Sequence, residues 1–108
     1  MTGYPPAGLG LYTKFIAQTG DGSRLVEHLL SAAALMESAP GCRLYIVNTT
    51  PDDADTVWVT EVWDGEEHHR ASLSIEGVPE LIAQARPLLA GPPEQIRVTP
   101  VGGKGLES

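Results

Sequence analysis

Residues 57–69, VWVTEVWDGEEHH, combine a strand, a turn and the start of a helix, and the fold is organised around them. Successive side chains of a strand point to opposite faces, so the odd-numbered residues of 57–63 share one face and the even-numbered residues share the other. Glu61 and Trp63 are therefore expected together on a face that is otherwise apolar. An ionised carboxylate loses hydration there and needs a partner or a raised pKa, so this face is the candidate functional site.

The helix that follows the strand is expected over residues 65–74. Asp64 is a residue type that caps helices, and Glu67 three residues later completes a capping box, which contributes roughly 1 kcal/mol. The strand then ends in a sharp change of direction. That turn should bring Glu61, Trp63 and the first turn of the helix close together.

Length and charge restrict the classes of protein. A chain of 108 residues builds one domain around one core, and 42% hydrophobic content is ordinary for a globular protein. No apolar run approaches the roughly 20 residues that span a bilayer. Seven basic against fourteen acidic residues give a net charge of -7, which opposes binding to nucleic acid or anionic lipid. We therefore expect neither a membrane nor a nucleic-acid partner.

The two ends of the chain show no folding pattern. Residues 1–8 have neither a positive start nor a hydrophobic segment, so they are expected to be a flexible leader rather than a signal peptide. Residues 102–108 are glycine-rich and are expected to be a flexible tail, which leaves a domain at residues 9–101. The single cysteine, Cys42, excludes an internal disulfide and fits a reducing cytoplasm, so a cytoplasmic location is expected.

Hydrophobic periodicity divides the rest of the chain into further elements. A strand is expected at residues 9–18, followed by a helix at 23–38 that is capped by Asp21 or Ser23. A second strand is expected at 42–49, a second helical stretch from residue 78 onward and a last strand at 95–101. Pro87 removes the hydrogen bond to the carbonyl of Ala83, so the second helix should kink or end near Arg86.

The strand at 42–49 is apolar on both faces, with Cys42, Leu44 and Ile46 expected to oppose Tyr45 and Val47. The turn chemistry of residues 50–55 joins it as a hairpin to the strand that follows.

The element order is strand, helix, strand, strand, helix, strand. This is the split β-α-β order of the ferredoxin-like fold, an α+β architecture in which both helices cover one face of an antiparallel sheet. The other face should be wet in a monomer, yet it would carry aromatic side chains such as Trp58, Tyr12 or Tyr45. Leaving each exposed forgoes on the order of 1.5 to 3 kcal/mol, so a second subunit's sheet is the simplest cover and a homodimer is expected.

Three short motifs carry a resemblance to a known family. They are PGC at 40–42, EVWD at 61–64 followed by Glu67, and ARPL at 85–88. Over residues 9–106 the chain resembles the antibiotic biosynthesis monooxygenase (ABM) domain family, including its quinol monooxygenases. The resemblance implies a dimeric α+β barrel with a pocket between the sheet and helices of each subunit. It also implies oxidation of phenolic or anthrone-like polyketides to quinones with O2, without metal or flavin.

The chemistry of such a reaction suggests roles for four residues. Triplet oxygen does not insert readily into closed-shell molecules, so the substrate must become the reductant, most easily as a phenolate. The protein supplies deprotonation, a dry cavity and fixed geometry. Glu61 or His69 could accept the proton, and Trp63 could form an aromatic wall and offer its indole hydrogen to a developing oxyanion or peroxide. Arg86 could bind an anionic substrate.

Each of these residues also has a structural interpretation. Glu61 could pair with a backbone donor or with a cation across the dimer. Trp63 could be a core residue, and the stem of Arg86 could simply cover apolar neighbours. His68 and His28 are expected to be solvated surface residues, and Cys42 an inert core residue.

Metal and haem sites are not expected. Ser72 stands eleven residues after the motif glutamate, where many relatives carry a histidine, so the haem ligand of the haem-degrading branch is absent. His68 and His69 are adjacent and lack the spacing of a helical metal pair. The acidic turn at residues 52–55 lacks the later glutamate of a calcium loop.

The leading functional hypothesis is a cofactor-independent monooxygenase acting on a phenolic, hydroquinone or anthrone-like substrate. One alternative is a non-catalytic dimeric protein that binds small molecules or is associated with stress. A second alternative is a cofactor-free cyclase or isomerase of the same barrel group, which would use the carboxylate and histidine as acid and base. Oxygen consumption separates the first hypothesis from the other two.

Overall fold

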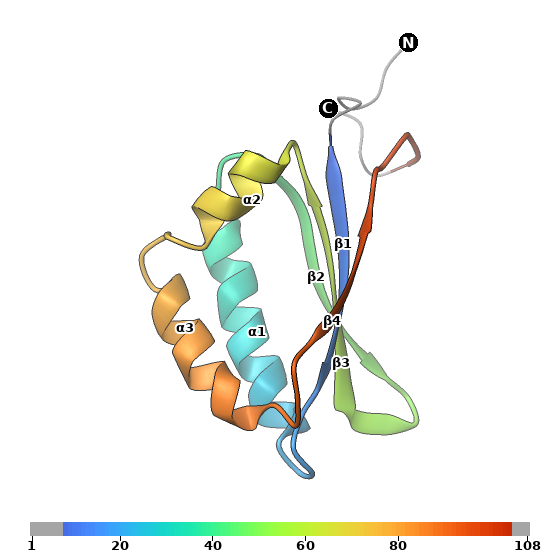
Figure 1. Cartoon of the computed structure of the whole chain (residues 1–108), viewed down its shortest axis with the longest axis vertical. Coiled ribbons are helices and arrows are strands. Elements are labelled where there is room, and N and C mark those ends of the chain that lie inside the picture. Colours follow the sequence, from blue (N-terminus) through green and yellow to red (C-terminus); the bar gives the residue numbers. More distant parts are fainter. Residues whose placement is uncertain (1–7, 105–108) are drawn as a thin grey trace.

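The computed structural model describes residues 8–104 and consists of an antiparallel sheet covered on one face by helices (Figure 1). Its elements are β1 (Leu9–Ile16), α1 (Gly22–Met36), β2 (Cys42–Thr50), β3 (Asp53–Trp63), α2 (Glu66–Ser72), α3 (Val78–Ala85), the 3-10 turn η1 (Arg86–Leu88) and β4 (Glu94–Val98). The four strands lie in the order β2-β3-β1-β4, which is the ferredoxin-like order. The predicted α+β fold class is confirmed.

The predicted leader at 1–8 and tail at 102–108 fall mainly on residues 1–7 and 105–108, which lie outside the described residues. Within the described part, the last strand is shorter than the predicted 95–101 and ends at Val98. No helix among residues 8–104 is long and apolar enough to cross a membrane.

The start of α1 is held by a residue from the hairpin rather than by its own cap. The helix begins at Gly22 after Asp21, whose side chain makes no capping hydrogen bond, so the predicted cap by Asp21 or Ser23 is wrong. The Asp55 carboxylate of β3 instead accepts hydrogen bonds from the backbone N–H groups of Gly20 and Gly22, at 3.1 and 2.9 Å. A distant carboxylate thus supplies the acceptor that a helix N-terminus needs.

The start of α2 also differs from the prediction. The helix begins at Glu66 with Gly65 before it, and no side chain caps it, so the predicted capping box of Asp64 and Glu67 is wrong. The Asp64 carboxylate accepts a hydrogen bond from Nε of Arg43 on β2. An arginine on the neighbouring strand therefore competes successfully for the carboxylate that the local pattern assigned to the helix.

A bulge at Arg43 changes the face of Cys42. Cys42 pairs with Trp63 and Leu44 pairs with Val62, so Arg43 is one extra residue in β2. Cys42 consequently lies on the helix-covered face with Tyr45, and both pack against the core cluster around Trp63. The expectation that Cys42 shares a face with Leu44 is wrong, because strict alternation does not hold across a bulge.

The second helical stretch breaks just before Pro87, as the sequence predicts. Helix α3 ends at Ala85, and residues 86–88 form the tighter turn η1 with Pro87 inside it. The predicted break near Arg86 is confirmed. Two clusters of buried side chains, one around Trp63 and one around Leu25, fill the space between the helices and the sheet.

The other face of the sheet is not covered by any helix, as Figure 1 shows. One cross-strand row on it runs through Ile46, Thr60, Tyr12 and Ile96. Its three large side chains are exposed: Ile46 to 46%, Tyr12 to 43% and Ile96 to 55%. This open face therefore carries large apolar side chains, and no element of residues 8–104 covers it.

Candidate functional site

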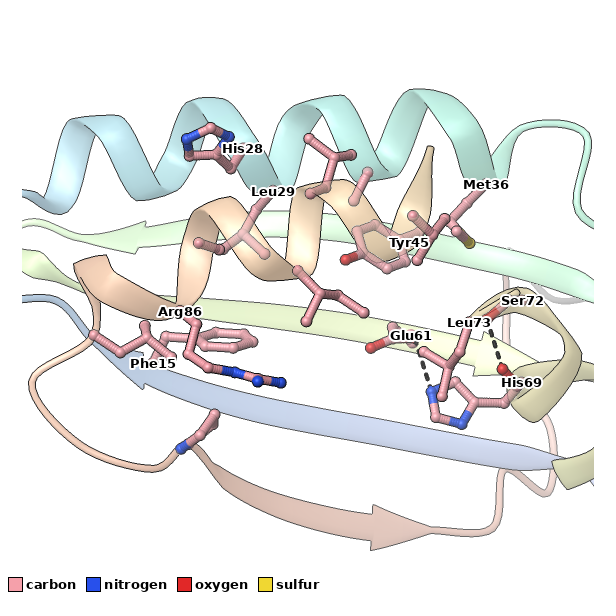
Figure 2. Close-up of a pocket in the computed structure, with 17 residues that line it drawn as sticks. Phe15, His28, Leu29, Met36, Tyr45, Glu61, His69, Ser72, Leu73 and Arg86 are labelled. Atoms are coloured by element: carbon pink, nitrogen blue, oxygen red, sulfur yellow. Dashed lines mark hydrogen bonds and ion pairs between the residues drawn. The ribbon is translucent and has the colours of Figure 1, made fainter. Parts of the chain in front are cut away.

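A cavity of about 310 Å³ lies between the helix-covered face of the sheet and helices α1, α2 and α3 (Figure 2). Most of its wall is apolar, and that wall includes Phe15, Leu29, Met36, Leu73, Leu81 and Leu89. A few polar side chains also line it, namely His28, Tyr45, Glu61, His69, Ser72 and Arg86. An apolar hollow with a few polar groups is the usual form of a small-molecule site.

Glu61 is the buried carboxylate of the cavity. It lies on β3 between Leu11 of β1 and Tyr45 of β2, and it is 8% exposed. Its Oε1 accepts a 3.0 Å hydrogen bond from Nε1 of Trp63. Burial raises the pKa of Glu61, and the hydrogen bond from Trp63 opposes part of that rise.

His69 reaches the same part of the cavity from α2. Its Nε2 lies 3.9 Å from Oε1 of Glu61. The centres of the His69 and Trp63 rings are 5.6 Å apart, and the two rings meet edge-on with an interplanar angle of 64°. Burial lowers the pKa of His69, Arg97 lowers it further, and Glu66 acts in the opposite direction. The imidazole is therefore biased toward its neutral form.

The pKa values of Glu61 and His69 are displaced toward each other. The carboxyl is more basic than an ordinary glutamate and the imidazole is less basic than an ordinary histidine, mainly because both are buried. A carboxyl and an imidazole shifted in this way beside an apolar cavity can accept a proton from a bound molecule and return it. The arrangement is therefore suited to acid-base chemistry.

Trp63 stands behind the carboxylate rather than in the wall. Its side chain is 1% exposed, belongs to the core and is not one of the residues that line the cavity. Its indole hydrogen, which the sequence interpretation offered to an oxyanion or peroxide, is directed to Glu61. The structure thus brings Glu61, Trp63 and His69 together, with Trp63 touching both partners.

Arg86 lies apart from this cluster, at the start of η1. Its side chain is exposed and, as Figure 2 shows, extends past Phe15 into the cavity. The guanidinium forms no ion pair with an acidic side chain of residues 8–104. It is free to bind an anion that enters the cavity.

The two other histidines are not the solvated residues that the sequence suggested. His28 is half-buried and lines the cavity from α1. His68 is half-buried, and its Nδ1 is buried without a hydrogen-bond partner among the described residues. The ring of His68 packs so closely on Gly41 that a Cβ at that position would lie 2.4 Å from its Cγ. The missing side chain of Gly41 makes this packing possible.

Ser72 occupies the position discussed for a haem ligand. It is buried, and its hydroxyl donates a 2.6 Å hydrogen bond to the backbone carbonyl of His69 (Figure 2). This contact secures the last turn of α2 on the residue that carries the imidazole. Among residues 8–104, no three His, Cys, Asp or Glu side chains are grouped as metal ligands would be.

Sequence reasoning counted Tyr45 among the aromatic residues of the open face, which is wrong, because Tyr45 pairs with Glu61 and lines the cavity on the helix-covered face. Burial raises the pKa of its hydroxyl well above the ordinary value, and the negative charges of Glu61 and Cys42 add to the rise. Burial also raises the pKa of Cys42, with Glu61 as the second cause. The alternation of β2 did mark Tyr45, but only the pairing of β2 with β3 shows that it faces Glu61.

The fold and cavity define a ferredoxin-like α+β protein with a buried carboxyl and an imidazole at an apolar pocket. The chain belongs to the antibiotic biosynthesis monooxygenase family, whose model matches residues 9–82. It is 42% identical to a Chloroflexus aurantiacus protein named "putative antibiotic biosynthesis monooxygenase", with a TM-score of 0.83 over 92% of this chain and 98% of that one.

More distant structures share the fold. A Caulobacter crescentus protein with the same name is 18% identical, with a TM-score of 0.82 over 92% of this chain and 94% of that one. SnoaB from Streptomyces nogalater, named a cofactor-independent oxygenase, is 16% identical, with a TM-score of 0.76 over 91% of this chain and 97% of that one. No curated protein matches the chain.

Proposed function

We propose that this protein is a cofactor-independent monooxygenase that oxidises a phenolic, hydroquinone or anthrone-like aromatic substrate with O2 to a quinone. The observation that carries the proposal is the placement of Glu61 and His69 at an apolar cavity, with pKa values displaced toward each other by burial. Membership of the family and the fold shared with SnoaB support the same reaction class.

The reaction balances without an external reductant. When a phenol becomes a quinone, one ring C–H becomes a carbonyl. One atom of O2 enters that carbonyl, and the other leaves as water with two hydrogens of the substrate. All the electrons that reduce O2 therefore come from the substrate, most readily once it is a phenolate.

The residues of the site divide the proton transfers. Glu61 accepts the phenol proton, because burial makes its carboxylate more basic than usual. Trp63 holds Oε1 of that carboxylate and so acts through Glu61 rather than on the substrate. His69, whose Nε2 lies 3.9 Å from the same oxygen, takes the phenol proton over from Glu61 and delivers it to the oxygen atom that leaves as water, which restores both groups to their starting forms.

Arg86 binds an anionic group of the substrate at the other side of the cavity. The absence of an ion pair with residues 8–104 supports this role, since no acidic side chain competes for the guanidinium. The apolar wall between Arg86 and Glu61 excludes water from the phenolate and from O2.

The working form is a homodimer in which the open faces of two sheets close a barrel. The exposed row of Tyr12, Ile46 and Ile96 supports this assembly, because a partner sheet would remove these side chains from water.

An oxygen electrode and a panel of phenols, hydroquinones and anthrones test the proposal. We expect O2 uptake that matches quinone formation one to one, with one atom of labelled oxygen gas in the quinone and the uptake strongly reduced in Glu61→Gln. A cyclase or isomerase would convert its substrate without consuming O2, and a binding protein would consume none. Oxidation that released hydrogen peroxide and left the quinone unlabelled would contradict monooxygenation.

A further inference from the structure

We propose that the Tyr45 hydroxyl is a second recognition point in the cavity, where it donates a hydrogen bond to a carbonyl oxygen of an aromatic ligand. The acidic hydroxyl of the same ligand lies at Glu61, so the inference rests on the proposed function for the role of that carboxylate. It narrows the substrate class to phenols conjugated with a carbonyl group.

Tyr45 lies beside Glu61 in the cavity, which is the first observation that supports the proposal. Tyr45 on β2 is the direct cross-strand partner of Glu61 on β3. Cβ atoms of directly opposed residues lie about 5 Å apart and their side chains leave the same face of the sheet. Both side chains line the cavity, and Figure 2 shows the Tyr45 ring with its hydroxyl directed toward Leu29 rather than at Glu61.

The Tyr45 hydroxyl is also available. It forms no hydrogen bond with the described residues, and the only fully buried side-chain atom without a partner among them is Nδ1 of His68. The Tyr45 oxygen is therefore accessible. Its side chain lines both the cavity and a more open and more polar groove between α1 and β2, and an aromatic ligand would meet it in the apolar cavity beside Glu61. An accessible donor in an apolar hollow fixes the orientation of a ligand.

The chemistry of the hydroxyl suits a donor and not a base. Burial and the charge of Glu61 raise its pKa above the ordinary value of 10.0, so the hydroxyl is protonated near neutral pH. When a phenol conjugated with a carbonyl loses its proton, negative charge spreads to the carbonyl oxygen. A neutral donor at that oxygen strengthens its hydrogen bond as the charge develops, which favours the deprotonated ligand.

Two ligands that differ only in the carbonyl provide the test. In para-hydroxybenzophenone the ring that bears the hydroxyl is conjugated with a ketone, and para-benzylphenol has a methylene group in its place. Calorimetric titration should show Tyr45→Phe binding the ketone about tenfold more weakly than the native protein, which corresponds to about 1.4 kcal/mol. The same variant should bind para-benzylphenol within about twofold of the native protein.

A matched control comes from the opposite face of the sheet. Tyr12→Phe removes a hydroxyl from β1 on the open face, so it should leave the affinities for both ligands unchanged. Equal weakening of both ligands in Tyr45→Phe would mean that the ring packs and does not recognise a carbonyl, and the proposal would be overturned. Failure of the native protein to bind the ketone would overturn it as well.

The binding comparison needs no turnover, so it separates this inference from the proposed function. A ketone-specific loss in a protein that consumes no O2 would leave the Tyr45 role standing and reject the monooxygenase. If the native protein consumed O2 but Tyr45→Phe showed no ketone-specific loss of affinity, the monooxygenase would stand and the Tyr45 role would be rejected. Circular dichroism of both variants confirms that neither comparison reflects unfolding.

Discussion

Trp63 and Glu61 are joined by a hydrogen bond of 3.0 Å from the indole Nε1 to Oε1 of the carboxylate, although only one residue separates them in β3. Alternation places both side chains on one face, and burial removes most of the carboxylate from solvent, which makes the indole an important partner. The bond fixes which carboxylate oxygen faces His69. The behaviour of the site should therefore depend on a residue that does not line the cavity.

Trp63→Phe should change the pH profile of oxygen uptake. It keeps most of the apolar volume but removes the hydrogen bond that lowers the pKa of Glu61, so that pKa should rise further and the acidic limb of the profile should move to higher pH. A tenfold loss of rate near neutral pH would correspond to about 1.4 kcal/mol. Trp63→Ala is less informative, because a cavity costs roughly 3 to 5 kcal/mol of stability.

The control for this experiment is Trp58→Phe, on the opposite face of β3, where Nζ of Lys14 lies 5.8 Å from the indole centre. Its pH profile should match that of the native protein. A folded Trp63→Phe protein with an unchanged profile would show that the indole only packs against its neighbours.

Glu61→Gln should remove a pH-dependent part of the stability. A pKa raised in the folded state contributes stability that is fully present below the ordinary value of 4.5 and is lost as pH rises through the folded value. The native protein should therefore lose stability relative to Glu61→Gln as pH rises from about 4 toward neutrality. Urea unfolding of both proteins across this range measures the difference, and parallel curves would mean that burial does not perturb the carboxyl.

His69→Asn should change the pH dependence of stability in the opposite direction to Glu61→Gln, and it should also impair turnover. A lowered pKa contributes stability that is present above the ordinary value of 6.5 and is lost as pH falls through the folded value, so the native protein should weaken relative to the variant below neutrality. Loss of a proton-transfer group should reduce oxygen uptake by roughly 10²- to 10⁴-fold. His68→Asn, which changes the histidine packed on Gly41, is the control and should retain uptake.

Light scattering after size exclusion should give twice the chain mass of 11.5 kDa. Ile46→Lys places a charge in the open face and should shift the protein toward the monomer, because the ammonium would be desolvated at the contact. Leu30→Lys changes a side chain on α1, on the helical side, that is somewhat more exposed than Ile46, and it should leave the mass unchanged. A native protein that stays monomeric at micromolar concentration would refute the dimer.

Several parts of the fold follow from short-range rules. Period-two alternation within β3 was enough to place Glu61 and Trp63 on one face, because no other strand is needed to decide it. The break after Ala85 follows from the missing N–H of Pro87. Element order alone led to the ferredoxin-like sheet.

Several of the incorrect predictions involve a partner from another segment. Asp64 matches a helix cap in its own sequence, but Arg43 of β2 takes its carboxylate. His68 looks like a surface residue until Gly41 is placed beneath it. The role of Tyr45 depends on the register of β2 against β3, which shifts between Thr49 and Thr50 at the hairpin end, and no local pattern announces that shift.

The Asp55 carboxylate has a consequence for the order of folding. It belongs to the β2–β3 hairpin, yet it completes the first turn of α1, more than thirty residues earlier, through the N–H groups of Gly20 and Gly22. The N-terminal turn of the helix therefore cannot be finished until the hairpin has closed and docked. The amide hydrogen of Gly22 should exchange with solvent at the rate at which the hairpin opens, so one helical amide reports the cooperativity of the whole sheet.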